Sequence, residues 1–165
     1  MADQQPVFDY TSSAPWEQVI KSYGGSEQIN EAIREMVSSG KRKDECWEAI
    51  WDHEVRAFEN DEEFREEVKA IYEAAGVNLL SVTPWTHESH VSERTGQRRD
   101  LSRWQARFDA AEWLHKVTSP EDARHVAENG DVGIVLNTQN VGAAIDGSLD
   151  RIDVLYNEGV RIFQL

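Results

Sequence analysis

Four short apolar segments, separated by longer amphipathic stretches, constrain the fold of this chain more than any other feature. They occupy residues 6–11, 77–83, 132–136 and 160–165, and each has the length of a β-strand rather than of a helix. The stretches between them repeat apolar residues every three or four positions, which is typical of helices that pack by one face. Strands that alternate with helices predict a parallel α/β sheet with right-handed crossovers.

The longest stretch without a strand, residues 26–75, predicts an all-helical insertion of three amphipathic helices after the first strand. Its last apolar stripe ends at Gly76, a residue type that closes many helices because it adopts the left-handed conformation readily. Trp47 and Trp51 fall on the apolar side, so we interpret them as core residues. The charged triplet at 52–54 is interpreted as solvated surface, because neighbouring residues on a helix point in different directions.

The second half of the chain predicts further helices between its strands. We expect residues 86–99 to form an irregular loop, followed by a helix that Asp100 caps and that reaches Leu114. Another helix is predicted to start at Ser119, because a serine hydroxyl can accept a hydrogen bond from a free backbone NH of the first turn.

Composition excludes several classes of function. The chain has 165 residues, which favours one domain, and 31 acidic against 17 basic residues give a net charge of -14. This charge repels phosphate backbones and argues against a nucleic-acid partner. The single Cys46 excludes an internal disulfide framework. No leader and no apolar run of about 18 residues is visible, so we predict a cytoplasmic protein without a membrane partner. An acid-rich, lysine-poor surface also suggests a halophilic source.

The pattern leaves two architectures open. The four strands could form a small, complete, doubly wound domain that ends on its last strand. They could instead form the N-terminal portion of a (β/α)8 TIM-type barrel, which typically takes about 250 residues. The chain ends on the apolar residues Phe163 and Leu165 without a following element. Pattern alone does not decide between these two folds.

Candidate chemistry gathers where the predicted strands end, because ligands of parallel α/β folds meet the carboxyl ends of the strands. Polar residues follow three of these ends, at 11–13, 83–85 and 137–140. Four consecutive amide or hydroxyl side chains are costly to bury without partners. The run at 137–140 therefore marks either a polar site or an exposed turn.

Two other clusters are interpreted without assigning them a site. His87 and His90 are three residues apart in the predicted loop, which is not the spacing of a helical zinc site, so we expect exposed histidines. Four arginines between residues 94 and 103 could bind a carboxylate or phosphate, but we favour their pairing with nearby acids. The chain contains neither a glycine-rich phosphate loop nor a nucleophile elbow.

Three segments near the end of the chain carry a resemblance to a known family. Residues 133–140 form a strand and a polar loop, residues 145–149 read Ile-Asp-Gly-Ser-Leu, and residues 155–165 begin Leu-Tyr-Asn-Glu-Gly-Val-Arg. Together they resemble the renal (membrane) dipeptidase family of zinc peptidases. In that family the third barrel strand ends at a metal-bridging glutamate, and an Asp-x-Ser-Leu helix and the fourth strand follow.

The resemblance implies a fold and an activity. The fold would be a (β/α)8 barrel, with residues 1–165 as a single incomplete barrel domain that stops at its fourth strand. The activity would be metal-dependent hydrolysis of dipeptides or related small amides. Two zinc ions bridged by a carboxylate and a hydroxide would activate water and stabilise the tetrahedral intermediate.

The residues at the implied ligand positions depart from the family pattern. When Asp9 is placed on the first acid of the family's Asp-x-His-x-Asp strand, Thr11 and Ser13 fall at the ligand positions. With a shift of about one residue in the loop, the bridging glutamate falls on Gln139. A neutral amide cannot replace a carboxylate that bridges two cations. We therefore assign no metal ligand and no catalytic residue, and predict that Asp9, Gln139 and Asn140 line the substrate site as hydrogen-bonding groups.

The leading functional hypothesis is a dipeptidase-like metallohydrolase, with zinc implied by the family and a small peptide or amide as substrate. One alternative is a catalytically degenerate barrel that only binds a small polar ligand. The other is a complete small α/β interaction domain, whose helical docking surface would be built on Trp47 and Trp51. The sequence leaves a homo-oligomer open.

Overall fold

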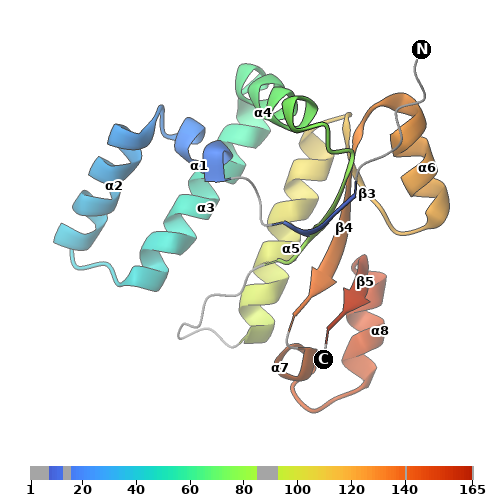
Figure 1. Cartoon of the computed structure of the whole chain (residues 1–165). Helices are drawn as coiled ribbons and strands as arrows, with labels where there is room; N and C mark the ends of the chain where they lie inside the picture. Colours follow the sequence, from blue (N-terminus) through green and yellow to red (C-terminus); the bar gives the residue numbers. More distant parts are fainter. Residues whose placement is uncertain (1–7, 13–15, 85–92, 140, 165) are drawn as a thin grey trace.

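The protein is described by a computed structural model, which covers residues 8–12, 16–84, 93–139 and 141–164. Strands and helices alternate along most of the chain, as Figure 1 shows. The strands are β1 (Phe8–Ser12), β2 (Leu79–Val82), β3 (Leu114–Lys116), β4 (Val132–Thr138) and β5 (Val160–Phe163). The helices are α1 (Trp16–Ser22), α2 (Ser26–Ser38), α3 (Lys43–Asn60), α4 (Glu62–Ala75), α5 (Glu93–Ala110), α6 (Pro120–Asn129), α7 (Val141–Ile145) and α8 (Asp150–Asn157).

The sheet is parallel, and its main strands follow one another in sequence order. β1 pairs with β2, β2 with β4, and β4 with β5. β3 pairs with the first half of β4, on the same flank where β5 pairs with the second half. A doubly wound sheet reverses its strand order, whereas a barrel keeps it. Strands β1, β2, β4 and β5 keep it, and only the three-residue β3 departs from it among the described strands, which confirms the prediction of a partial barrel-type α/β fold with a helical insertion after β1.

The hydrophobic core lies between one face of the sheet and the helices α3, α4, α5 and α8. Alternate residues of β2, β4 and β5 point into it, as the pleat of a strand requires. Its buried members from the strands are Leu80, Val82, Val132, Ile134, Leu136 and Val160. Those from the helices and loops include Phe58, Phe64, Val68, Leu101, Trp104, Trp113 and Leu155. This core fixes the strand ends that carry the candidate site.

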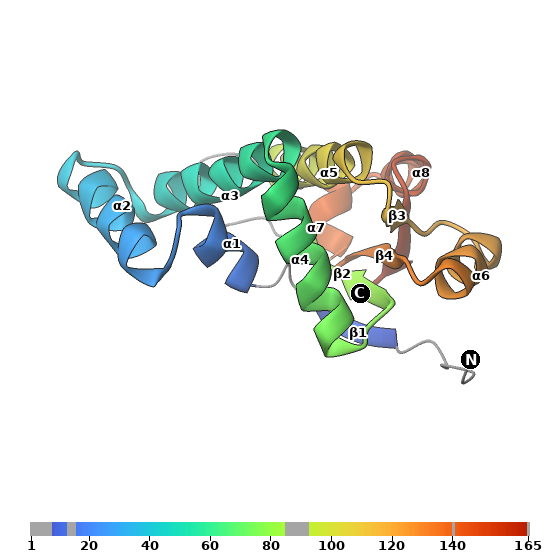
Figure 2. The same ribbon diagram turned by 90° about the horizontal axis from the view of Figure 1, so that it is seen from above.

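Helix α6 covers the opposite face of the sheet, and Gly133 allows it to come close. A Cβ at Gly133 would lie 2.7 Å from Val117 Cγ2 and 2.8 Å from Leu79 Cδ2, and 3.2 Å from Val126 of α6. Because neighbouring strand residues point to opposite faces, Gly133 faces α6 while Ile134 faces the core. In Figures 1 and 2, α6 lies at the end of the molecule away from α1–α3.

The insertion contains the three expected helices, α2, α3 and α4. As predicted, α4 ends at Gly76, whose φ of 65° is left-handed. A further helix, α1, precedes them and was not predicted. It packs with α2 and α3 in a second apolar cluster around Val19, Ile29 and Ile50. Figures 1 and 2 place α2 farthest from the sheet.

Two expectations about the middle of the chain are wrong. Asp100 does not cap the helix, because α5 already begins at Glu93; the Asp100 carboxylate instead accepts a hydrogen bond from Arg103 within the helix. Leu114 belongs to β3 and not to the helix, because its backbone is held beside Val132 of β4. His87 and His90 lie outside the described residues.

The prediction that residues 52–54 form solvated surface is wrong for Glu54, whereas the side chain of Asp52 is 46% exposed. Glu54 is completely buried and pairs with Arg107. Asp52 pairs with Arg103, and His53 Nε2 lies 2.8 Å from a backbone oxygen of α1. The three side chains thus have three different partners.

The pairing of the arginine cluster with acids is confirmed where its side chains are described. Arg98 pairs with Glu158 at 3.4 Å, and Arg99 pairs with Glu48 at 2.7 Å. Arg103 shares the same Glu48 carboxylate at 2.6 Å. These arginines therefore join α5 to α3 and to the chain beside β5. None of the described helices has the length and apolar character needed to cross a bilayer.

Candidate functional site

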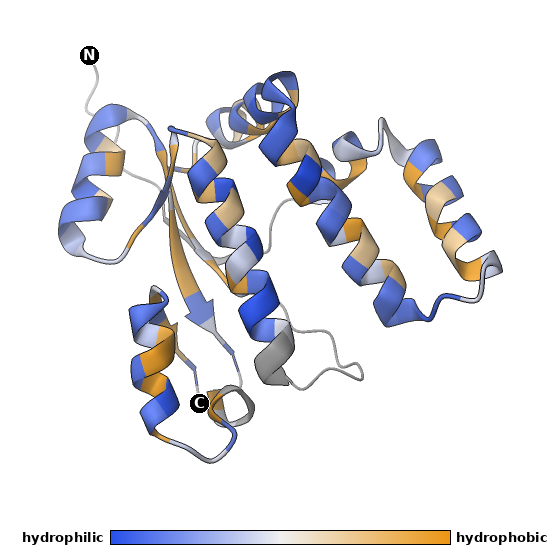
Figure 3. Ribbon diagram, turned by 180° about the vertical axis from the view of Figure 1, so that it is seen from behind, coloured by the Kyte–Doolittle hydropathy of each residue, from blue (hydrophilic) through white to orange (hydrophobic). Residues whose placement is uncertain are grey.

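Polar side chains meet where β2 and β4 end side by side. We call Ser81, Thr83, Gln97, Asn137 and Thr138 the carboxyl-edge cluster. Asn137 Nδ2 donates to Ser81 Oγ at 2.8 Å, and Thr83 Oγ1 donates to Asn137 Oδ1 at 2.6 Å. Figure 3 shows the change along β4, the long central strand, which is hydrophobic up to its hydrophilic arrowhead. The buried Asn137 is therefore satisfied by partners, as its desolvation requires.

The opposite face of β4 is tied down as well. Thr138, next to Asn137, points toward α5, where Gln97 Nε2 donates to its hydroxyl at 3.0 Å. Both residues of this pair are buried. Hydrogen bonds on both faces thus fix the last two residues of the strand before the chain enters the bend at Gln139.

The backbone around Gln139 is held at the edge of the sheet by Gln164, which follows β5. The Gln164 NH donates to the Thr138 carbonyl at 2.9 Å, and its own carbonyl accepts from the Val141 NH at 3.0 Å. Gln139 lies between these two bonds, and its side chain is exposed. An exposed amide group therefore stands at a fixed point of the carboxyl edge.

The other two predicted substrate-site residues are placed less fully. The Asp9 backbone pairs with Leu80, which in turn pairs with Ile134. Asp9 is thus level with a residue five positions before Gln139, which is about 16 Å along a strand. The side chain of Asp9 and the whole of Asn140 lie outside the described residues. Their assignment to the site stays a prediction.

The described donor set does not fit the two-zinc site that the resemblance implies. Zinc is held by thiolate, imidazole or carboxylate groups. Every described side chain of the carboxyl-edge cluster, and that of Gln139, is a neutral hydroxyl or amide. The Thr11 backbone lies in β1, whereas its side chain and Ser13 lie outside the described residues. We therefore derive no reaction step through a metal at this edge.

Two members of the carboxyl-edge cluster were not singled out from the sequence. Ser81 lies two residues before Thr83, so the period of a strand places both on one face and could have suggested it. Gln97 lies among arginines that were considered only for their charge. Its role depends on how α5 packs on the sheet, which no local pattern records.

The carboxyl group whose pKa is clearly raised lies among the helices of the described structure and not at the carboxyl edge. Burial raises the pKa of Asp100 to about 6, although the hydrogen bond and the charge of Arg103 act in the opposite direction. Asp100 lies on α5, where Arg103 Nη1 donates to its carboxylate at 2.6 Å. Its raised pKa therefore reflects burial between α5 and α3.

A second cluster of chemistry-bearing residues lies at the other end of the strands. His115 of β3, His125 of α6 and Asp131, just before β4, place one possible ligand atom each within 4.8 Å of one another. We call them the His-His-Asp cluster. His125 follows His115 by 10 residues, and Asp131 follows His125 by 6 residues. This spacing matches no metal-binding motif. Sequence reasoning missed this cluster entirely.

The comparisons with known proteins support the fold. No protein-family model and no curated protein matches the chain. Among solved structures, the crystal structure of dipeptidase AC, described as a metallopeptidase of family M19, matches with a TM-score of 0.59 at 12% identity. The match covers 97% of this chain and 42% of that protein. The chain therefore shares its fold with somewhat less than half of a metallodipeptidase.

Proposed function

We propose that this chain is the N-terminal part of a dipeptidase-like barrel hydrolase, which acts on dipeptides or related small amides in a protein that supplies the remaining strands. The observation that carries the proposal is the series of parallel pairs β1-β2, β2-β4 and β4-β5, with the exposed Gln139 directly after β4. The likeness to the first part of a metallodipeptidase supports it at the level of the fold.

The chain's own part in this function is to bind and orient a peptide group. The exposed Gln139 amide offers both a donor and an acceptor, which matches the NH and carbonyl of a small amide. The half-buried Thr83 donates its only hydroxyl proton to Asn137, so its remaining lone pairs can only accept. Thr83 is thereby set to receive a substrate NH. The hydrolytic groups would lie on other strands.

A second candidate function follows from the same neutral donor set. A barrel that retained the polar edge and lost its metal ligands would bind a small polar ligand without hydrolysing it. The absence of any carboxylate or imidazole among the described side chains of the carboxyl-edge cluster favours this candidate. It differs from the first only in catalysis, so one experiment separates them.

The experiment is to measure dipeptide hydrolysis and dipeptide binding with the full-length natural protein, each with and without added zinc. We expect hydrolysis, and we expect Gln139→Ala to raise KM about tenfold with kcat nearly unchanged, because a lost hydrogen bond of about 1.4 kcal/mol corresponds to that factor. Gln28→Ala, which changes an exposed glutamine of α2, is the matched control.

Binding without hydrolysis would select the degenerate barrel. If neither hydrolysis nor binding is found, both candidates are wrong. A Gln139→Ala protein with the same KM as the Gln28→Ala control would show that the substrate does not meet this bend. The coding sequence that follows Leu165 supplies an independent check, since further strand-helix units should continue there.

A further inference from the structure

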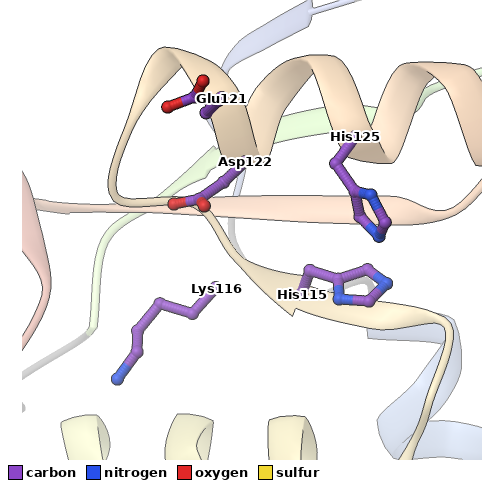
Figure 4. A pocket seen from close by; sticks show the side chains of 5 residues that line it. All are labelled: His115, Lys116, Glu121, Asp122 and His125. Atoms are coloured by element: carbon purple, nitrogen blue, oxygen red, sulfur yellow. The ribbon is translucent and has the colours of Figure 1, made fainter.

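We propose that the His-His-Asp cluster binds one zinc ion at the amino edge of the sheet. This site is separate from the carboxyl edge and does not depend on the proposed function. His115 Nε2 lies 2.9 Å from Asp131 Oδ2, and the His115 and His125 rings approach edge to face with their centroids 5.7 Å apart. Figure 4 shows the two rings close together, one from β3 and the other from α6.

The donor set and its spacing suit zinc. Two imidazoles and one carboxylate are common zinc ligands, and water completes the coordination of many such three-ligand sites. Ligand atoms about 2.0–2.1 Å from a tetrahedral zinc ion are about 3.4 Å apart. The present separations, from 2.9 Å to at most 4.8 Å, bracket this value. Zinc would replace the direct contact between His115 Nε2 and Asp131 Oδ2, and His125 would move inward.

The backbone that carries the cluster is fixed before any metal binds. His115 is paired with Gly133 in the sheet, and the Asp131 NH donates to the carbonyl of Val126 at 3.1 Å. Val126, next to His125 on α6, is completely buried. Each ligand therefore stands on an element whose position is set by packing, and only side-chain rotation is needed to close the site.

The surroundings favour a cation at this place. The cluster borders a hollow of about 300 Å³, lined by His115, Lys116, Glu121, Asp122 and His125 (Figure 4). The Lys116 ammonium donates to Gln105 at 2.7 Å and points away from the two rings in Figure 4. Its positive charge is thus held away from the ligands, while the acidic groups of the hollow add negative potential.

Two neighbours help to define the ligand set. Asn129, one turn after His125 on α6, places its amide nitrogen 3.1–3.2 Å from the two ring nitrogens, and because this nitrogen can only donate, zinc would displace it from the ring nitrogen that it binds. The Asp122 carboxylate already accepts hydrogen bonds from Thr118 and Ser119 at the start of the helix. Asp122 is thus committed to capping, and the three members of the cluster remain as ligands.

Zinc at this position would join α6 to the strands on which it packs. One of its ligands belongs to β3, one lies just before β4, and the third belongs to α6. The ion would therefore hold α6 against β3 and against the start of β4, within the β3-α6-β4 crossover. Since a metal that binds only the folded state stabilises it, zinc should raise the melting temperature of the protein.

The test is calorimetric titration of the metal-free full chain with zinc, alongside His125→Ala and Glu128→Gln variants. His125 and Glu128 are both exposed on α6, so neither substitution should prevent folding, which circular dichroism checks. We expect one zinc ion per chain in the parent and in Glu128→Gln, and at least a tenfold weaker affinity in His125→Ala. Magnesium prefers oxygen ligands, so it should not bind at this site in the parent or in either variant.

The melting temperature gives a second readout. Zinc should raise it in the parent and in Glu128→Gln, and not in His125→Ala. The proposal is overturned if the parent does not bind zinc, or if His125→Ala binds it as tightly as Glu128→Gln does. Binding of a dipeptide at the carboxyl edge should be the same in all three proteins, so a failure here would not be mistaken for a failure of the proposed function.

Discussion

At the scale of single residues, Gly133 decides how closely α6 can approach the sheet. The side chains of Leu79, Val117 and Val126 converge on the space that a Cβ would fill at this position. Val117 and Val126 are buried and Leu79 belongs to β2, so these side chains cannot rotate away freely, because protein interiors are close-packed. The tight contact between α6 and β4 therefore depends on the absence of a side chain at this residue.

We predict that Gly133→Ala lowers the free energy of unfolding by about 1–3 kcal/mol, the usual cost of adding a methyl group to a filled core. Urea unfolding followed by circular dichroism measures it. Gly142→Ala is the matched control, since no atom of the described residues lies within 4 Å of the position of its Cβ. An equal stability of the two variants would show that the α6 contact is looser than described.

Local residue chemistry was also the part of the sequence that predicted structure best. Ser119 caps α6 by accepting from the Asp122 NH at 3.1 Å, and Gly76 closes α4, both as expected. Such features depend on atoms three or four residues apart, which a sequence records directly. The burial of Glu54 was not predicted, because its partner Arg107 is 53 residues away.

At the scale of elements, α3 and α5 are joined by a shared network of charges. The guanidinium of Arg103 donates to Glu48, Asp52 and Asp100 at 2.6–3.0 Å. Arg99 places a second cation on the Glu48 carboxylate. Partial burial acts to raise the pKa of Glu48, but the hydrogen bonds and charges of Arg99 and Arg103 prevail and hold this pKa below its usual value. Asp100 is the member for which burial prevails and raises the pKa.

The raised pKa of Asp100 predicts how stability depends on pH. The folded protein holds this proton more tightly than the unfolded chain, so the associated stabilisation is complete below about pH 4 and is lost as the pH rises through about 6. A rise of the pKa from 3.8 to about 6 corresponds to about 3 kcal/mol. Asn cannot ionise, so Asp100→Asn should gain stability relative to the parent as the pH increases.

Chemical denaturation at about pH 4.5 and about pH 7.5 tests this prediction, and we expect the difference in stability to move toward the variant by about 2 kcal/mol. Asp109→Asn, which removes an exposed negative charge from the same helix, is the control. A difference that does not change with pH, or that moves toward the parent, would contradict the burial of an ionisable Asp100.

At the scale of the whole molecule, the helical insertion and the sheet are connected through a buried ion pair. Glu54 lies on α3 of the insertion, and Arg107 lies on α5, which packs on the sheet. Both are almost completely buried, and the Arg107 guanidinium also lies 4.9 Å from the centroid of the Trp104 ring. Removing one partner leaves a charge in the interior without its counter-ion.

We predict that Glu54→Gln lowers the free energy of unfolding by about 3–5 kcal/mol, the cost of breaking a buried ion pair. Glu59→Gln, at an exposed position of the same helix, should change it by less than about 0.5 kcal/mol. The measurement is urea unfolding at constant pH. If the two variants were equally stable, the pair would contribute nothing to holding the insertion against the sheet.

The overall architecture could be predicted because β1, β2, β4 and β5 each coincide with a short apolar run in the sequence. The three-residue β3 is too short to show a period, and α1 was not singled out. The candidate sites divide in the same way. Gln139 was found at the end of an apolar strand, whereas the His-His-Asp cluster is assembled only by the crossover that brings three distant elements together.

The two hydrogen bonds on Gln164 have a consequence for how this edge can vary. They anchor the chain at Thr138 and again at Val141. The connection between these two residues therefore has to cover a fixed distance with a fixed number of residues. An insertion or deletion there would pull one anchor out of register with the neighbouring strand. Homologous proteins should therefore diversify this connection by exchanging side chains while conserving its length.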